Sequence, residues 1–113
     1  MGQAGRYLRK TDGGYGHFCP ACREMHVFST DKPNTKGAQW TFCGTIESPA
    51  FTPSMNIRWG TYADPSFVEE EPGDSGVCHY TISSGKINFH GDCTHAMKGT
   101  VVPLPELPDA FRD

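Results

Sequence analysis

Two cysteines separated by two residues, Cys19 and Cys22, form the clearest chemical motif in this chain. The tight turn of Pro20-Ala21 points both sulfur atoms at one centre, and such a pair supplies half of a tetrahedral zinc site. A thiol–disulfide exchange site is the alternative for this spacing, but it places its first cysteine at the start of a helix. The residues after Cys22 alternate like a strand instead. The motif therefore predicts half of a metal site.

The other half is expected from a Cys/His cluster near the C-terminus. A hairpin that turns on Ser84-Gly85 puts Cys78 and, further along, Cys93 on its apolar side. A slip of one residue in the register would exchange Cys78 for His79, and His95 can replace Cys93 because the chain need not stay extended there. The candidate ligands are therefore Cys19, Cys22, Cys78, Cys93, His79 and His95, with Zn2+ as the expected cofactor.

Several other residues near these motifs have open interpretations. His26 could complete a C-x2-C-x3-H triplet, or it could be a hydrogen-bonded surface residue. Asp92 could orient a histidine of a second cluster, His79 or His95, as carboxylates do around metal ligands. It could equally cap the turn that leaves the strand. Three residues are expected outside any site: His17 and His90 at the surface, and Cys43 as a small buried apolar side chain.

Composition explains why a metal would be needed. Only 19 of the 113 residues are Leu, Ile, Val or Phe, a small core for one domain. The five cysteines are an odd number, and the first residues lack the apolar run of a secretory signal. Metal binding in a reducing cytoplasm is therefore favoured over disulfides. No stretch reaches the eighteen apolar residues of a membrane-spanning helix.

The elements that must position these residues are short strands. Gly and Pro occur throughout, and short apolar runs alternate with turn signals, which predicts a small, irregular, zinc-stapled all-β fold with hairpins and little or no helix. In the hairpin that turns on Ser84-Gly85, Ser83 should pair with Lys86 and Ile82 with Ile87. The prolines of residues 47–55 predict an irregular loop or a sheet edge. We expect one domain, residues 1–113, whose Pro-rich tail, residues 100–113, runs extended over the surface.

The string of motifs resembles a family of small phage and prophage zinc-binding proteins of unknown function, often labelled "ammonia monooxygenase" in phage genomes. The shared elements are Cys19-Pro20-Ala21-Cys22 with His26, Trp40-Thr41-Phe42-Cys43-Gly44, Pro49 with Phe51-Thr52-Pro53-Ser54, Cys78-His79, Gly85-Lys86-Ile87, Asp92-Cys93-Thr94-His95-Ala96-Met97-Lys98-Gly99, and Val101-Val102-Pro103-Leu104-Pro105. The resemblance implies zinc binding and a phage origin. The monooxygenase label conflicts with a chain that has no membrane span. Small phage proteins of this kind often bind host machinery, including defence complexes.

Three functions are compatible with these observations. The favoured one is a phage-encoded, non-enzymatic accessory protein that binds a host protein or complex in the bacterial cytoplasm. Inhibition of a host defence complex, as by an anti-CRISPR protein, is one form that this role could take. The alternative is a small zinc-dependent hydrolase that uses His26, His79 and His95 with Asp92. The third is a nucleic-acid-binding module like a zinc ribbon, which the net charge of −3 disfavours.

Overall fold

The computed structural model describes residues 3–71 and 73–112. Their regular structure consists of two antiparallel sheets and two 3-10 turns, η1 (Gly60–Tyr62) and η2 (Asp109–Phe111). This confirms the predicted all-β fold. Within the described ranges no helix has the length and apolar character needed to cross a bilayer.

The N-terminal sheet is a meander of four strands in the order β1-β2-β3-β4. The strands are β1 (Gln3–Ala4), β2 (Leu8–Thr11), β3 (Gly14–Cys19) and β4 (Glu24–Ser29). The Cys-Pro-Ala-Cys motif forms the turn between β3 and β4, where the amide of Arg23 bonds to the carbonyl of Cys19 over 2.8 Å. The sheet therefore presents this motif at one of its ends.

The second sheet is also a meander, in the order β5-β6-β7-β8-β9. Its strands are β5 (Thr41–Gly44), β6 (Pro49–Trp59), β7 (Gly76–Ser83), β8 (Lys86–Phe89) and β9 (Val101–Pro103). Ser83 pairs with Lys86 and Ile82 with Ile87, which is the predicted register. Ser84 and Gly85 both have positive φ, 51° and 71°, as a type I′ hairpin turn requires.

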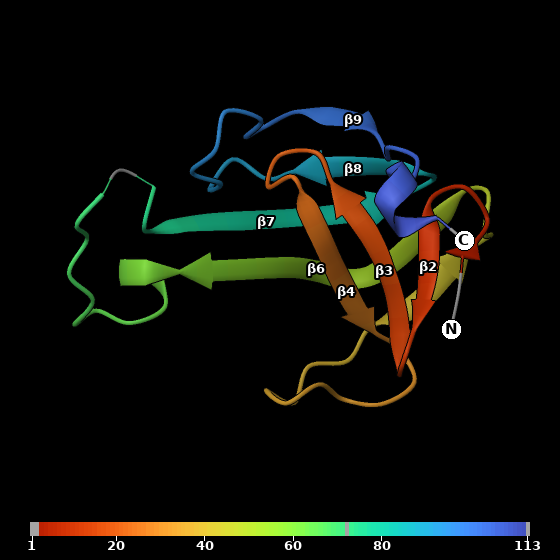
Figure 1. Ribbon diagram of the computed structural model, residues 1–113, viewed down its shortest axis with the longest axis horizontal. Helices are drawn as coiled ribbons and strands as arrows, with labels where there is room; N and C mark the ends of the chain where they lie inside the picture. The colour runs from red at the N-terminus through yellow and green to blue at the C-terminus, as the bar shows by residue number, and fades with distance from the viewer. Residues whose placement is uncertain (1–2, 72, 113) are drawn as a thin grey trace.

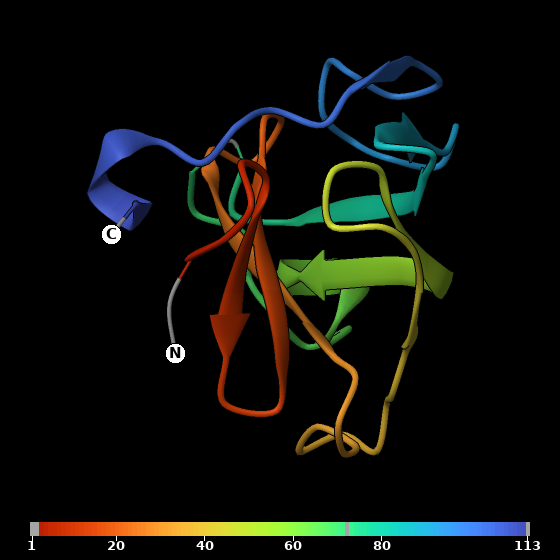
Figure 2. The ribbon, with the colours of Figure 1, turned by 90° about the vertical axis from the view of Figure 1, so that its right-hand side faces the viewer.

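The two sheets pack face to face around an aromatic core. In Figure 1 the strands β3 and β4 cross β6 and β7 steeply, and Figure 2 shows the same two layers from the side. Phe28 of β4 stacks on Phe51 of β6 with ring centroids 4.2 Å apart, and Trp40 meets Phe28 edge-on at 5.4 Å. Tyr80 of β7 is fully buried among them. Burial of these apolar side chains holds the two sheets together, and it thereby places the turn between β3 and β4 next to β7.

Two segments differ from a simple reading of their prolines. Residues 47–55, expected to form an irregular loop or a sheet edge, enter the long strand β6 at Pro49, and the pairing of this strand with β7 is irregular between Phe51 and Met55. Pro49 is the first residue of the strand, and Pro53 follows the point where pairing with β5 ends at Thr52, so neither removes a ladder bond there. The Pro-rich tail lies along the sheets and buries Leu104 and Leu107 almost completely.

Candidate active site and metal centre

Strand β7 separates two clusters of reactive side chains. Alternate residues of a strand point to opposite faces, and on β7 the side chains of Cys78, Tyr80 and Ile82 are buried in the core. His79 and Thr81 are half-buried on the other face. The adjacent residues Cys78 and His79 therefore belong to different sites.

On the outer face, His79 lies between a serine and an aspartate. The hydroxyl of Ser54 is 2.9 Å from Nε2 of His79, and Nδ1 of His79 is 3.1 Å from each carboxylate oxygen of Asp92. The side chain of His79 is 21% exposed and that of Asp92 is 53% exposed. A serine, a histidine and an aspartate joined in this order by two hydrogen bonds form the arrangement that activates a serine nucleophile.

The pKa of Asp92 shows which groups of the triad carry protons. Partial desolvation raises the pKa of the Asp92 carboxyl, but the hydrogen bond and charge of His79 act against it, and the pKa ends below its ordinary value. Asp92 is therefore ionised at neutral pH and accepts from Nδ1–H of His79. That tautomer leaves the lone pair of Nε2 free to accept the hydroxyl proton of Ser54.

The segment after β8 holds His79 in place. Strand β8 ends at Phe89, but the turn that follows it continues alongside β7 and hydrogen-bonds to the β7 backbone where β8 no longer does. The amide of His79 donates to Sγ of Cys93 over 3.3 Å, and the Cys93 thiol and the His90 amide both donate to the His79 carbonyl. The His90 ring also lies against the His79 ring, with centroids 4.1 Å apart. The same turn places Asp92 within reach of His79.

Ser54 owes its position to an irregularity in β6. Phe51 pairs with Ile82 and Met55 with Tyr80, so four residues of β6 advance opposite only two of β7. The extra residues contain the cis peptide bond between Thr52 and Pro53. Ser54 follows directly, and its carbonyl accepts a hydrogen bond of 3.1 Å from the Trp40 indole.

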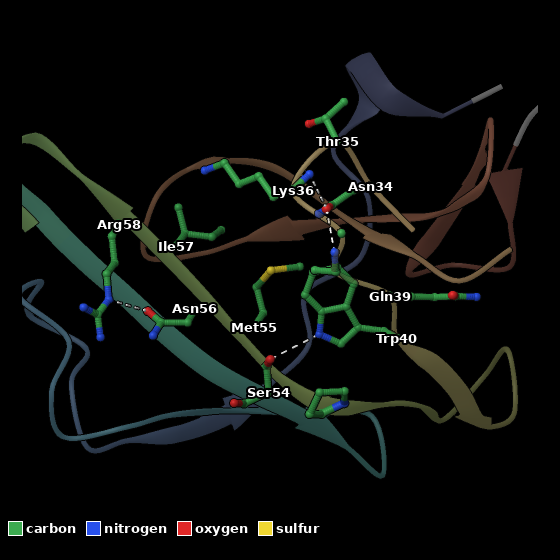
Figure 3. A pocket seen from close by; sticks show the side chains of 13 residues that line it. Asn34, Thr35, Lys36, Gln39, Trp40, Ser54, Met55, Asn56, Ile57 and Arg58 are labelled. Carbon is green, nitrogen blue, oxygen red and sulfur yellow. Dashed lines mark hydrogen bonds between the residues drawn. The ribbon is translucent and has the colours of Figure 1, made fainter. Parts of the chain in front are cut away.

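A cavity of about 660 Å³ opens beside Ser54. One wall is the β6 segment from Pro53 to Arg58, and the other is the chain from Asn34 to Trp40. Figure 3 shows Ser54 near one end of the β6 wall and Arg58 near the other. The serine of the triad therefore borders a space that can receive a substrate.

On the inner face of β7, three thiols meet. Cys19 and Cys22, from the turn between β3 and β4, lie close enough to Cys78 of β7 for the three thiols to shift one another's pKa. The Cys22 and Cys78 thiols lower the pKa of Cys19 well below its ordinary value, whereas the Cys19 and Cys22 thiols, together with burial, raise the pKa of Cys78. Three thiols from two sheets, one of them readily ionised, are a donor set suited to a soft metal ion.

A histidine joins this thiol cluster. The ligand atoms of Cys19, Cys22 and His26 all lie within 4.8 Å of one another, so these residues could hold a metal ion. Nδ1 of His26 is 3.0 Å from the Tyr80 hydroxyl, whereas its buried Nε2 has no hydrogen-bond partner among the described residues and lies 3.5 Å from a carboxylate oxygen of Glu24. The Tyr80 hydroxyl continues to Nε2 of His17, at 2.6 Å. This chain fixes Nδ1 of His26 and leaves Nε2 available as a ligand.

The burial of His17 corrects one expectation. It was predicted at the surface, but it is fully buried, and burial lowers its pKa to about 3, with the charge of His26 acting in the same direction. The sequence offers no spacing signal for it, because its partner Tyr80 lies 63 residues away. His90, also expected at the surface, is half-buried against His79.

The remaining predicted ligands are divided between the two faces. His95 lies beside Cys22 in a second, smaller cavity, and its buried Nε2 has no described hydrogen-bond partner. Cys93 is buried, which raises the pKa of its thiol, and it bonds the backbone of His79. His79 itself faces Ser54. Ligation by Cys93, His79 and His95 therefore stays a prediction, and the half-buried Cys43 lies outside both clusters.

One known family matches most of the chain. Residues 2–90 match the model of the family described as "Bacterial ubiquitination-like system serine protease (BubE)". The chain belongs to the BubE family. The matched range contains Ser54 and His79 and ends two residues before Asp92. No curated protein matched the chain, and neither did any solved structure.

The BubE match identifies a bacterial family, whereas the resemblance to a phage zinc-binding family stays a prediction. Ser54 was not among the candidate site residues and was named only as part of a shared loop motif. A catalytic serine has no spacing rule comparable to that of paired cysteines. Nothing in the sequence around Thr52-Pro53-Ser54 distinguishes this serine from the others.

Proposed function

We propose that this BubE-family chain is a serine protease in which Ser54 is the nucleophile, His79 the general base and Asp92 the residue that orients His79. One observation carries the proposal: the continuous pair of hydrogen bonds from Ser54 through His79 to Asp92. The description of the family supports it, and so does the cavity beside Ser54. As the family description suggests, the substrate belongs to a bacterial ubiquitination-like system.

The expected reaction is acyl transfer. Ser54 Oγ attacks the carbonyl carbon of a peptide or isopeptide bond while Nε2 of His79 takes the hydroxyl proton. His79 then gives that proton to the leaving amine, and the acyl group stays on Ser54 as an ester. A water molecule, deprotonated by the same nitrogen, hydrolyses the ester and restores the serine. Asp92 stays ionised and stabilises the charged imidazole throughout.

A fluorophosphonate probe tests this assignment, because it reacts only with activated serines. We expect labelling of the wild-type chain at Ser54, found by mass spectrometry of the labelled peptide, and no labelling of Ser54→Ala. Asp92→Asn should slow labelling by about 10³-fold or more, because the histidine is then held in the wrong tautomer. Ser66→Ala is a matched control, since Ser66 is exposed and bonds only to Asp64 among the described residues. Equal labelling of wild type and Ser54→Ala would exclude the triad.

We further propose that the thiol cluster binds Zn2+ as a structural ion. Cys19, Cys22 and Cys78 supply three sulfurs, and His26 supplies the nitrogen, with His95 as the alternative. Four protein ligands close a zinc site and leave no position for a substrate water, which suits a structural role. The ion would join the turn between β3 and β4 to β7, and it would supply the stability that the small core lacks.

Elemental analysis by mass spectrometry tests the zinc proposal. We expect one Zn2+ per chain in the wild type and none in Cys19→Ala, which should also lose its cooperative thermal unfolding. Cys43→Ala, which changes a cysteine outside the cluster, should keep both. A Cys19→Ala variant that remains well folded without metal would show that the cluster is not a structural zinc site.

The interaction role suggested by the sequence stays a prediction, as do its host partner and the exclusion of nucleic acid. An interaction module and a protease respond differently to one variant. Ser54→Ala should keep any partner bound if binding alone is the function, whereas a protease should lose all product formation. Trapping of an uncleaved substrate on Ser54→Ala would favour the protease.

A further inference from the structure

The cavity beside Ser54 follows an open edge of the second sheet. Strand β5 pairs with β6 only as far as Thr52, whereas β6 continues to Trp59. Beyond Thr52, one edge of β6 pairs with β7, and the opposite edge faces the cavity instead of a strand. In Figure 3 the chain from Asn34 to Gln39 lies across the cavity from this edge.

The direction of the backbone groups on β7 shows which groups of β6 face that edge. Both the amide and the carbonyl of Val77 bond to Thr94, and those of His79 bond to Cys93 and His90. The amides and carbonyls of Val77 and His79 therefore point away from β6. In an antiparallel ladder their partners on β6 point away as well. Arg58 pairs with Val77 and Asn56 with His79, so the amides and carbonyls of Asn56 and Arg58 are directed at the cavity.

No described residue is hydrogen-bonded to these backbone groups of Asn56 and Arg58. They are two residues apart, which is the repeat at which an added strand exchanges hydrogen bonds with an edge. The Ser54 carbonyl lies on the same edge and is already bonded to the Trp40 indole. The row of open groups therefore begins just past the nucleophile.

The side chains along this edge show which strand would fit. The cavity is lined by two cations, Lys36 and Arg58, and by no carboxylate, although the whole chain has a net charge of −3. Among the described residues, Arg58 has only Asn56 as a side-chain partner, at 3.4 Å. Arg58 lies four residues beyond Ser54, so an extended chain spans the two positions in roughly 13 Å.

We propose that the open edge of β6 binds an acidic, extended polypeptide as an added strand, and that the bond presented to Ser54 lies about four residues from a carboxylate that pairs with Arg58. The inference rests on the proposed protease function and names its class of substrate. Backbone pairing at Asn56 and Arg58 provides affinity for any extended chain, and the two cations select the acidic one. A flexible tail or linker can adopt this extended conformation at the edge of β6, so we expect the substrate to present such a segment.

A peptide library made by digesting a bacterial proteome tests the selection. Mass spectrometry of products formed by the full-length wild-type chain should show Asp or Glu enriched about four residues from the cleaved bond, on one side only. For a cleaved acidic peptide and its neutral analogue, Arg58→Gln should lower the ratio of kcat/KM values about tenfold. Lys86→Gln removes an exposed cation from the distant strand β8 and should leave that ratio unchanged. Cleavage with no acidic enrichment would overturn the charge selection.

Single N-methylation of backbone amides in the best peptide tests the added strand. Two positions, separated by one tolerant residue, should each lose at least tenfold in kcat/KM, because each removes a hydrogen bond to the edge. A uniform response along the peptide would overturn the inference. If Ser54 reacts with the fluorophosphonate but no library peptide is cleaved, this inference is wrong and the proposed hydrolase stands. If neither occurs, the proposed function fails, and the inference fails with it.

Discussion

The two faces of β7 hold clusters of opposite character. The inner cluster holds the ligand atoms of Cys19, Cys22 and His26 within 4.8 Å of one another, with Cys78 of β7 next to them, and all but the half-buried Cys22 are buried. The outer cluster is built by one sheet, its histidine is partly exposed, and its serine borders a cavity. A buried set of soft donors suits a permanent ion, whereas a half-exposed triad suits a substrate that comes and goes. The cysteines and histidines of this chain therefore fall into two clusters, and the proposed catalytic role belongs to the outer cluster alone.

Substitution of the two neighbours on β7 should have the largest effects and should separate the faces. We expect His79→Ala to lose activity by about 10⁴-fold or more while keeping its metal and thermal unfolding, because its side chain is outside the core. Cys78→Ala should lose the metal and the folded state together. Activity, metal content and unfolding should be measured on both. A metal-free His79→Ala, or a metal-replete Cys78→Ala, would contradict the division.

Tyr80→Phe should sharpen the description of the inner face. The substitution leaves Nδ1 of His26 and Nε2 of His17 buried without their shared partner, which costs about 1–3 kcal/mol of unfolding free energy. Metal affinity should fall about 10- to 100-fold, because the ligand His26 loses the group that orients it. Competition with a chromophoric chelator measures the affinity. Tyr62→Phe, at an exposed tyrosine, is the control, and an unchanged affinity in Tyr80→Phe would argue for His95 as the ligand.

Cys93→Ser should have the smallest effect, and it should show whether Cys93 supports the backbone of His79 or ligates the metal. The serine hydroxyl can still donate to and accept from the backbone of His79, so we expect a loss of about 1 kcal/mol in stability and a few-fold fall in kcat. Metal content should not change. Loss of the metal in this variant would instead support the ligand role that the hairpin register predicts for Cys93.

The sequence was most informative where local rules apply. The Ser84-Gly85 turn determined the register of its hairpin, and alternation along it placed Cys78 and Tyr80 in the core. The possible pairing of Asp92 with a histidine was also foreseen, and it occurs with His79. Each of these inferences needs only a turn and a period of two.

Long-range contacts could not be predicted in the same way. Ser54 meets His79 only because β6 has extra residues opposite β7 at one point, and no pattern in the sequence announces such an irregularity. The burial of His17 depends on a hydroxyl from the other sheet. Cys93 is buried, as its predicted place on the apolar side of the hairpin requires, but its thiol donates to the carbonyl of His79.

The dipeptide Cys78-His79 has a consequence for how this chain can change. The proposed metal centre and the proposed triad each use one of these two consecutive residues, so no fragment can retain one site and discard the other. Insertion or deletion of a single residue upstream within β7 would also exchange their faces, sending the thiol outward and the imidazole into the core. The strand should therefore tolerate substitutions at Thr81 far better than any change of length.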